Sequence, residues 1–247
     1  MHEPPAPGFV ANWPAPPWVR TLSTCRKGGV SVGEWSSLNL GDRCGDNPAH
    51  VAENRRRVLS HINVLPRWLH QVHGNRIVGD HDLHREADAS WTRQAGVACV
   101  ILTADCMPLL FCHRHERIVA AAHAGWRGMA GGVIEATVNA LSVDPSELLV
   151  WMGPTIGPES FEVGEEVRAA FLAHDPRAVQ AFRPGVQGKW WADLYQLARQ
   201  RLDCLGISGI FGGDHCTVQE QERFFSHRRD HGRSGRMGNF IWLERDS

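Results

Sequence analysis

Residues 117–128, RIVAAAHAGWRG, decide the expected fold because an apolar run ends there and a helical pattern begins. Small apolar side chains from Ile118 to Ala122 predict a β-strand, and His123 stands at its end. From Trp126 to Leu141 the apolar residues recur at helical spacing and share one face, namely Met129, Val133, Ile134, Thr137, Val138 and Leu141. His123 therefore lies where a predicted strand passes into a predicted helix.

The segments around this stretch predict an α/β fold with mixed sheets and helices outside. MPLLFC (107–112) and RIVAAAHAG (117–125) form a hairpin joined by the polar HRHE, and VACVILTADC (97–106) is a buried strand. Helices are expected at 46–62, 163–174 and 194–206. Asn47 caps the start of the first helix, Pro48 fits its first helical position, and Gly206 caps the end of the third helix. Further strands are expected at 19–25, 67–74, 75–79, 147–154, 209–217 and 239–243. Because hairpins alternate with β-α steps, a strict doubly wound sheet is excluded.

The bulk composition predicts one enzyme-sized domain without a nucleic-acid or membrane partner. The 247 residues suit a single domain over 18–247, preceded by a proline-rich arm over 1–17. The formal net charge of -1 gives no global basic field for nucleic acid. The arm lacks the apolar core of a signal peptide, and no apolar run is long enough for a membrane span, so we expect a cytoplasmic protein. The seven cysteines, an odd number without a CxxC pair, favour reduced thiols or a metal site.

Three polar corners follow three of the apolar strands and carry residue types that can bind metals. They place His73 in HQVHG, Cys106 in TADC and His123 in AHAGWRG. Two histidines and a cysteine could hold a metal with one position open, which is the arrangement of catalytic zinc. The alternative stays open, because a single histidine at a strand end is most often structural and the spacing matches no short metal motif.

Four further residues are candidates for contact with a substrate or with phosphate. Arg127 stands beside Gly125 and Gly128 at the start of a predicted helix, where free backbone N–H groups bind anions. Arg26 lies in the glycine turn RKGGVS, and Arg228 lies in the arginine-rich segment 224–236. Glu162, between Phe161 and Val163, is a candidate substrate contact or general acid/base. A solvated surface position is the alternative for each of them.

Together these motifs resemble the YfiH family, also called laccase-domain or polyphenol oxidase-like proteins. The resemblance runs in order from about Trp18 to Leu243. It is carried by STCRKGGVS, SLNLGDRCGDNPAHVAENR, HQVHG, ADAS, TADCMPLLF, AAHAGWRGMAGGV, MGPTIGPESFEVG, FGGDHCT, FFSHRRD and GRMGNFIWL. It implies a layered α/β/β/α fold with mixed sheets and a zinc or copper site at His73, Cys106 and His123. It also matches the family's arginine to Arg26, with Cys25 where threonine is common.

The resemblance implies purine nucleoside chemistry. The expected reactions are phosphorolysis of adenosine, inosine, guanosine and methylthioadenosine, and deamination of adenosine. The expected partners are purine nucleosides and phosphate, with zinc, or alternatively copper, as cofactor. A monomer or a weak homo-oligomer is expected.

Three other functions remain alternatives. In a metal-free cysteine hydrolase or amidase, such as an editor of peptidoglycan precursors, Cys106 would be the nucleophile and His123 its base. A copper-dependent polyphenol oxidase is the second, although the histidine pairs of multicopper sites are missing except for HRH at 113–115. The third is a metal-binding module without enzymatic activity.

Overall fold

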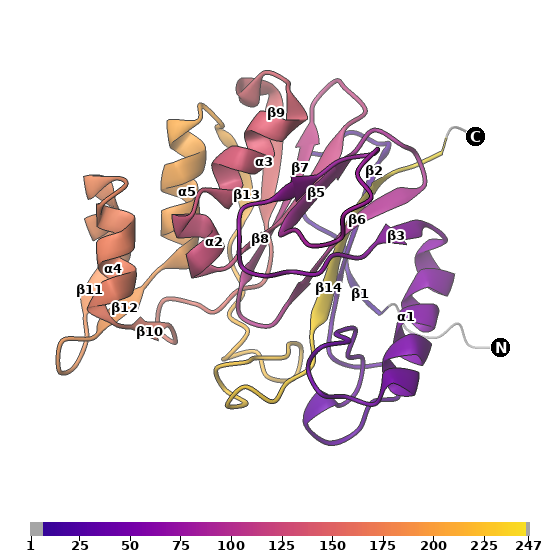
Figure 1. Cartoon of the computed structure of the whole chain (residues 1–247), viewed down its shortest axis with the longest axis horizontal. Helices are drawn as coiled ribbons and strands as arrows, with labels where there is room; N and C mark the ends of the chain where they lie inside the picture. The colour runs from indigo at the N-terminus through magenta and orange to yellow at the C-terminus, as the bar shows by residue number, and fades with distance from the viewer. Residues whose placement is uncertain (1–6, 246–247) are drawn as a thin grey trace.

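Two large mixed sheets and one small sheet form the computed structural model, which describes residues 7–245 (Figure 1). The five-stranded sheet has, in order, β1 (Gly8–Phe9), β2 (Val19–Thr24), β14 (Met237–Leu243), β6 (Val97–Thr103) and β3 (Leu65–Arg67). The six-stranded sheet has β13 (Gly209–Gly212), β9 (Leu148–Met152), β7 (Met107–His113), β8 (Val119–Ala124), β5 (Ala89–Thr92) and β4 (Ile77–Val78). Each contains both parallel and antiparallel pairs, which confirms the predicted mixed sheets.

Five α-helices occur in the described residues 7–245, and three of them cover the outer faces of the two large sheets. The five are α1 (Pro48–Ile62), α2 (Trp126–Ala130), α3 (Val133–Leu141), α4 (Glu165–Leu172) and α5 (Leu194–Cys204). Short 3-10 helices occur at Gly33–Trp35, Pro145–Glu147 and Pro176–Ala181. α3 and α5 pack on the six-stranded sheet, and α1 packs on the five-stranded sheet. No helix in the described range 7–245 is long and apolar enough to span a bilayer.

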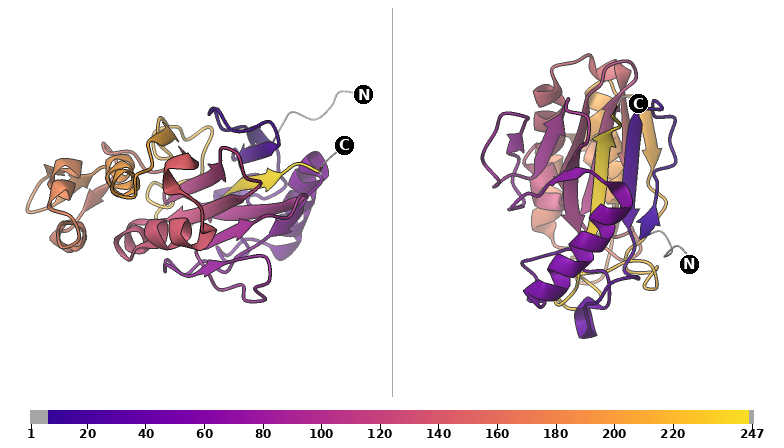
Figure 2. Two further views of the ribbon diagram at one scale, coloured as in Figure 1. Left: turned by 90° about the horizontal axis from the view of Figure 1, so that it is seen from above. Right: turned by 90° about the vertical axis from the view of Figure 1, so that its right-hand side faces the viewer.

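The two large sheets stack face to face, as the right-hand view of Figure 2 shows. Ile101 and Ile241 of the five-stranded sheet pack with Leu110 and Val119 of the six-stranded sheet in one buried cluster. The order of layers is therefore helix, sheet, sheet, helix, which confirms the expected α/β/β/α architecture. β6 and β7 follow one another in the chain but belong to different sheets, so residues 104–106 carry the chain across the sandwich.

Most predicted elements are confirmed, and their local causes are visible. The side chain of Asn47 accepts a hydrogen bond from the Ala49 N–H at the start of α1, and the following Pro48 needs no N–H partner. The β7–β8 hairpin pairs antiparallel from Met107 to Cys112. The six apolar positions predicted for one helix face are all buried.

Three features differ from the sequence expectation. The helix expected over 126–141 breaks at Gly131 and Gly132, because Gly132 adopts a φ of 88° and starts α3 anew. Residues 67–74 are not one strand, since pairing with β6 ends at Arg67 and His70 makes only an isolated bridge. The small sheet of β10 (Glu162–Val163), β12 (Trp190–Ala192) and β11 (Phe182–Pro184) was not expected, and it lies with α4 at one end of the molecule (Figure 1).

The proline-rich segment 1–17 falls partly outside the described residues, which begin at residue 7. Within its described part, β1 pairs with β2 through Gly8 and Phe9, and the Phe9 ring lies 6.2 Å from the Trp151 ring. This part of the segment is therefore packed against the sandwich.

Candidate metal centre

Two histidines and a cysteine from three separate segments meet at one edge of the sandwich. His73 lies in the loop before β4, Cys106 at the crossing between β6 and β7, and His123 near the end of β8. One ligand atom from each lies within 4.8 Å of the others, and the rings of His73 and His123 are 4.7 Å apart. His123 is buried, Cys106 half-buried and His73 exposed, so the cluster is open to solvent on one side.

Asp88, which directly precedes β5, fixes both histidines. Its carboxylate accepts a hydrogen bond from His123 Nδ1 at 2.8 Å and from the backbone N–H of His73 at 2.9 Å. The N–H groups of Val72 and Gly74 donate to the other oxygen of the same carboxylate. Because Nδ1 of His123 is directed at Asp88, Nε2 is left for a metal ion, as in other metal sites where a carboxylate orients a histidine.

Asp105 holds the corner that presents Cys106. It adopts a φ of 85°, a conformation that costs free energy outside glycine. Its carboxylate accepts hydrogen bonds from Thr217 Oγ1 at 2.5 Å and from the Arg228 N–H at 2.6 Å. Its carbonyl accepts from Thr155 Oγ1 and from the Ile156 N–H. These contacts come from two connections, β9–β10 and β13–β14; they offset the strain and keep Cys106 at the cluster.

Gly125 leaves the room that the cluster needs. A Cβ atom at this position would lie 2.8 Å from Cys106 Sγ and 3.4 Å from His73 Cδ2. Any larger residue would push the thiol away, so the glycine after His123 is required by close packing. Its φ of -65° is an ordinary value for any residue, so the backbone conformation alone does not require glycine here.

The electrostatics of the cluster favour a thiolate. Burial raises the pKa of the Cys106 thiol, but the charge and hydrogen bond of His123 and the contact with His73 lower it to about 6. Burial lowers the pKa of His123, while the Cys106 thiolate and the hydrogen bond to Asp88 raise it to about 9. Without a metal the pair is therefore a thiolate beside an imidazolium. A metal cation can take the place of the imidazolium proton.

The donor set fits a metal ion. Two imidazoles and a thiolate are ligands for zinc and for copper, and three protein ligands leave a coordination position for water or substrate. The buried Asp88 carboxylate supplies the outer hydrogen bond that metal-binding histidines usually have. No other group of three or more histidine, cysteine or acidic side chains within the described residues could hold a metal.

The cluster opens into a pocket of about 270 Å³. Its walls come from the loop 41–44, the 69–73 segment, the end of β6 and the C-terminal loops. The charged and titratable side chains of the lining, besides the cluster, are Asp42, Arg43, Cys44, His227 and Arg236. Burial and the charge of Arg236 lower the pKa of His227, which favours the neutral imidazole.

The four residues predicted to contact substrate or phosphate lie in different places. Arg228 and Glu162 come together, because Arg228 Nη1 donates to the Glu162 carbonyl at 3.0 Å, next to the Asp105 corner. Arg26 donates to the carbonyls of Ser36 and Gln221 and lines a separate cavity of about 370 Å³. Arg127 is exposed and stacks on Trp126 at 4.5 Å. None of the four lines the pocket of the cluster.

The sequence patterns gave no role to Asp88 or Arg43, whereas Arg236 belongs to the arginine-rich segment that was expected to bind an anion if it lined a pocket. Asp88 carries a signal in the sequence, since one acid stands among small residues in ADAS at the start of a strand. A carboxylate buried there needs several donors, which marks it as an organising residue. Arg43 gave no comparable signal, because only the fold brings its loop and the segment of Arg236 to one pocket.

Comparison with known proteins gives consistent results over nearly the whole chain. Residues 20–244 match the family described as multi-copper polyphenol oxidoreductase laccase. The chain is 51% identical over 242 residues to a protein of Escherichia coli K12 named purine nucleoside phosphorylase YfiH, with 95% of this chain and 98% of that protein covered. It is also 51% identical to purine nucleoside phosphorylase PA4543 of Pseudomonas aeruginosa, with 96% of this chain and 98% of that protein covered.

Solved structures agree with the fold. The crystal structure of Neisseria meningitidis protein NMB0706 superposes with a TM-score of 0.93 at 46% identity, covering 97% of this chain and all of that one (100%). YlmD from Geobacillus stearothermophilus superposes with a TM-score of 0.87 at 32% identity, covering 93% of each chain.

Proposed function

The chain belongs to the family of multi-copper polyphenol oxidoreductase laccases that includes the YfiH proteins, and on this premise we propose that it is a purine nucleoside phosphorylase. The observation that carries the proposal is the His73–Cys106–His123 cluster at the base of an open pocket. Relatives at 51% identity bear the name of this activity. The proposed substrates are adenosine, inosine, guanosine and methylthioadenosine, and adenosine is also deaminated.

Phosphorolysis exchanges one bond at the sugar for another. A phosphate oxygen forms a bond to the anomeric carbon C1′ while the bond between C1′ and the purine nitrogen breaks. The electron pair of the broken bond leaves with the purine, which takes up a proton. Deamination replaces the amino group at C6 of adenine with oxygen from water and releases ammonia. Both reactions need a polar pocket that orients the nucleoside, and deamination also needs an activated water.

The proposed ligands are His73, Cys106 and His123, and the proposed metal is zinc, with copper as the alternative. A bound zinc ion would supply a Lewis acid that lowers the pKa of a coordinated water. The protein contributes the orientation of this cluster. Asp88 holds His123 and the loop of His73, while Asp105 holds the corner of Cys106. Roles in substrate binding for Arg26, Arg127, Glu162 and Arg228 stay predictions.

The decisive experiment measures hypoxanthine released from inosine by purified protein with and without phosphate. We expect release that depends on phosphate, together with formation of ribose 1-phosphate. His73→Ala and His123→Ala should each abolish it, and His84→Ala, an exposed histidine outside the pocket, is the control. Unchanged release in either cluster variant would overturn the proposed site. No release from inosine by the zinc-loaded parent would overturn the proposed activity.

A specific observation supports a cysteine hydrolase or amidase as the second candidate. Cys106, His123 and Asp88 form a chain in which the thiol meets the imidazole and the imidazole meets a buried carboxylate. This is the order of groups in cysteine nucleophile sites, with Cys106 attacking and His123 as base. Iodoacetamide distinguishes the two candidates. A metal-bound thiolate becomes much more reactive after chelation, whereas a free nucleophile reacts at the same rate with or without chelator.

A further inference from the structure

We propose that Arg43 and Arg236 form the phosphate subsite of the pocket that holds the His73–Cys106–His123 cluster. The inference rests on the proposed phosphorylase function, because phosphate is the co-substrate of that reaction. It selects Arg236 from the arginine-rich segment 224–236 and adds Arg43, to which the sequence patterns gave no role. It also separates them from Arg26 and Arg127, which lie outside the pocket.

Both arginines line the pocket from segments that are far apart in the chain. Arg43 lies in the loop after β2, and Arg236 directly precedes β14. Asp42 is the one acid of this lining in the described part of the chain, and it is paired with Arg55 of α1 at 3.4 Å. The wall formed by Arg43 and Arg236 is therefore positive, which suits a phosphate dianion.

Arg236 has hydrogen-bonding capacity to spare. Its Nη1 donates to the carbonyls of Ser234 at 2.6 Å and Gly235 at 3.0 Å, which fixes the direction of the side chain. Among residues 7–245 its Nε and Nη2 make no hydrogen bond. A guanidinium held at one end and free at the other can offer two parallel N–H groups to one phosphate.

The loop that carries Arg43 is tied to the strand of Arg236 by one buried side chain, Asn39. Its Oδ1 accepts from the N–H of Gly41 and from the N–H of Arg236, each at 2.8 Å. Its Nδ2 donates to Asp46 Oδ2 at 2.8 Å and to the Gly41 carbonyl. Asn39 thus joins the two walls that bear the arginines.

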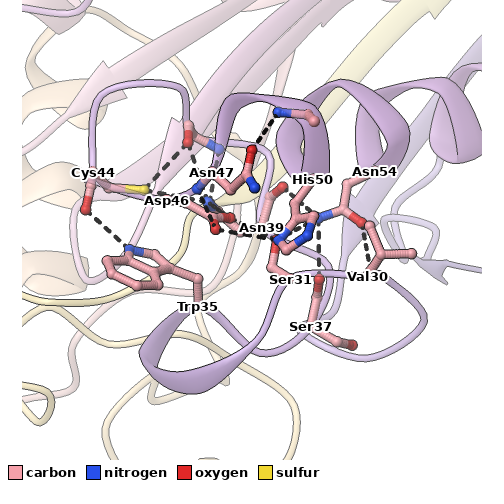
Figure 3. A network of polar contacts seen from close by, with 12 residues as sticks. Val30, Ser31, Trp35, Ser37, Asn39, Cys44, Asp46, Asn47, His50 and Asn54 are labelled. Carbon is pink, nitrogen blue, oxygen red and sulfur yellow. Dashed lines mark hydrogen bonds and ion pairs between the residues drawn. The ribbon is translucent and has the colours of Figure 1, made fainter.

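Figure 3 shows the network that keeps this loop rigid. Asp46 accepts a hydrogen bond from Ser31 Oγ at 2.6 Å, and Asn54 of α1 donates to Ser31 Oγ at 2.9 Å and to the Asn39 carbonyl. Trp35 Nε1 donates to the Cys44 carbonyl next to Arg43. A preorganised loop binds an anion without first losing conformational entropy.

Gly41 allows the close approach of the two walls. A Cβ atom there would lie 2.6 Å from Cγ of Arg236. The Arg236 side chain therefore runs directly over the loop that precedes Arg43. The glycine is explained by this packing, in the same way that Gly125 is explained by Cys106.

The test compares the phosphate dependence of single variants. For Arg236→Gln and Arg43→Gln we expect the KM for phosphate to rise about tenfold or more, with the KM for inosine changed far less, because charge-assisted hydrogen bonds to phosphate are lost. Arg236→Lys should raise the KM for phosphate less than Arg236→Gln does, because lysine keeps the positive charge but lacks the two parallel N–H groups of the guanidinium. Arg233→Gln is the matched control, because Arg233 is in the same segment but is exposed and pairs with Glu34 at 2.9 Å.

A second readout does not depend on turnover. Inorganic phosphate should raise the melting temperature of the parent and of Arg233→Gln, but not that of Arg236→Gln, whose melting temperature without phosphate shows whether it is folded. If the parent binds phosphate through Arg236 but releases no purine, the proposed function fails while the subsite stands. If phosphate binding and its KM are unchanged in Arg236→Gln and Arg43→Gln, the subsite is wrong, whatever the activity.

Discussion

At the level of single residues, Asp88 determines which nitrogen of His123 faces the pocket. One carboxylate takes hydrogen bonds from the imidazole and from three successive backbone N–H groups. Burial raises its pKa, but these donors, His123 first among them, hold the pKa below its usual value of 3.8. Asp88 therefore stays ionised at neutral pH, and its negative charge would partly neutralise the positive charge of a bound metal ion.

Asp88→Asn tests this role. The amide keeps the size of the side chain but removes its charge and one acceptor, so the orientation of His123 weakens. We expect the affinity for zinc to fall about 10- to 100-fold, measured by competition with a chromophoric chelator. Asp82→Asn, an exposed position in the same segment, is the control. Equal zinc affinity in the folded Asp88→Asn variant would contradict the assignment.

At the level of elements, the break between α2 and α3 turns on one backbone conformation. Gly132 has a φ of 88°, and a Cβ atom there would meet only Glu135 Oε2 at 3.6 Å. Space is therefore available, and the cost of a side chain comes from the backbone alone. The break lets α2 start next to the cluster while α3 packs on the sheet.

Gly132→Ala should lower the free energy of unfolding by about 1–2 kcal/mol, because alanine is strained in the left-handed region. Gly132→Asn should lower it less, because asparagine tolerates this region better. Urea unfolding of both variants measures the difference. Equal stability of the alanine variant and the parent would show that the helix break does not depend on this conformation.

The elements show which parts of the fold the sequence could predict. Strands and helices with five or more patterned residues were predicted, as β6 to β9 and α1 show. The break at Gly132 was missed because the apolar spacing continues through it. The small sheet was missed because strands of two or three residues carry no periodic signal. The corners of Cys106 and His123 were predictable as strand ends, whereas His73 lies in a loop where a strand was expected. The hydrogen-bond partners of Asp88 and Asn39 come from segments that are distant in the chain, so the sequence did not predict them.

At the level of the whole molecule, Asp80 links the two large sheets. Its carboxylate accepts hydrogen bonds from Thr92 Oγ1 at 2.5 Å, at the end of β5 in one sheet, and from Arg67 Nη2 at 3.1 Å, in β3 of the other. The Arg93 N–H also donates to it. Burial raises the pKa of Asp80, but these donors outweigh burial and hold it below its usual value of 3.8.

Asp80→Asn should therefore change how stability depends on pH. A carboxyl whose pKa is lower in the folded state stabilises the fold above its unfolded pKa, and this contribution is lost as the pH falls through the folded pKa. At pH 7 the variant should be less stable than the parent by roughly 2 kcal/mol. This difference in the free energy of unfolding should become smaller below about pH 4. Urea unfolding at both pH values checks this, with Asp82→Asn as control. A stability difference that does not change with pH would contradict this role of the ionised Asp80.

The position of β14 has a consequence for the synthesis of the protein. β14 lies between β2 and β6 in the five-stranded sheet, although both neighbours precede it by more than a hundred residues in the chain. Until residues 237–243 leave the ribosome, the nascent chain exposes two unpaired strand edges that can recruit other chains. The five-stranded sheet can therefore be completed only after translation has passed this strand.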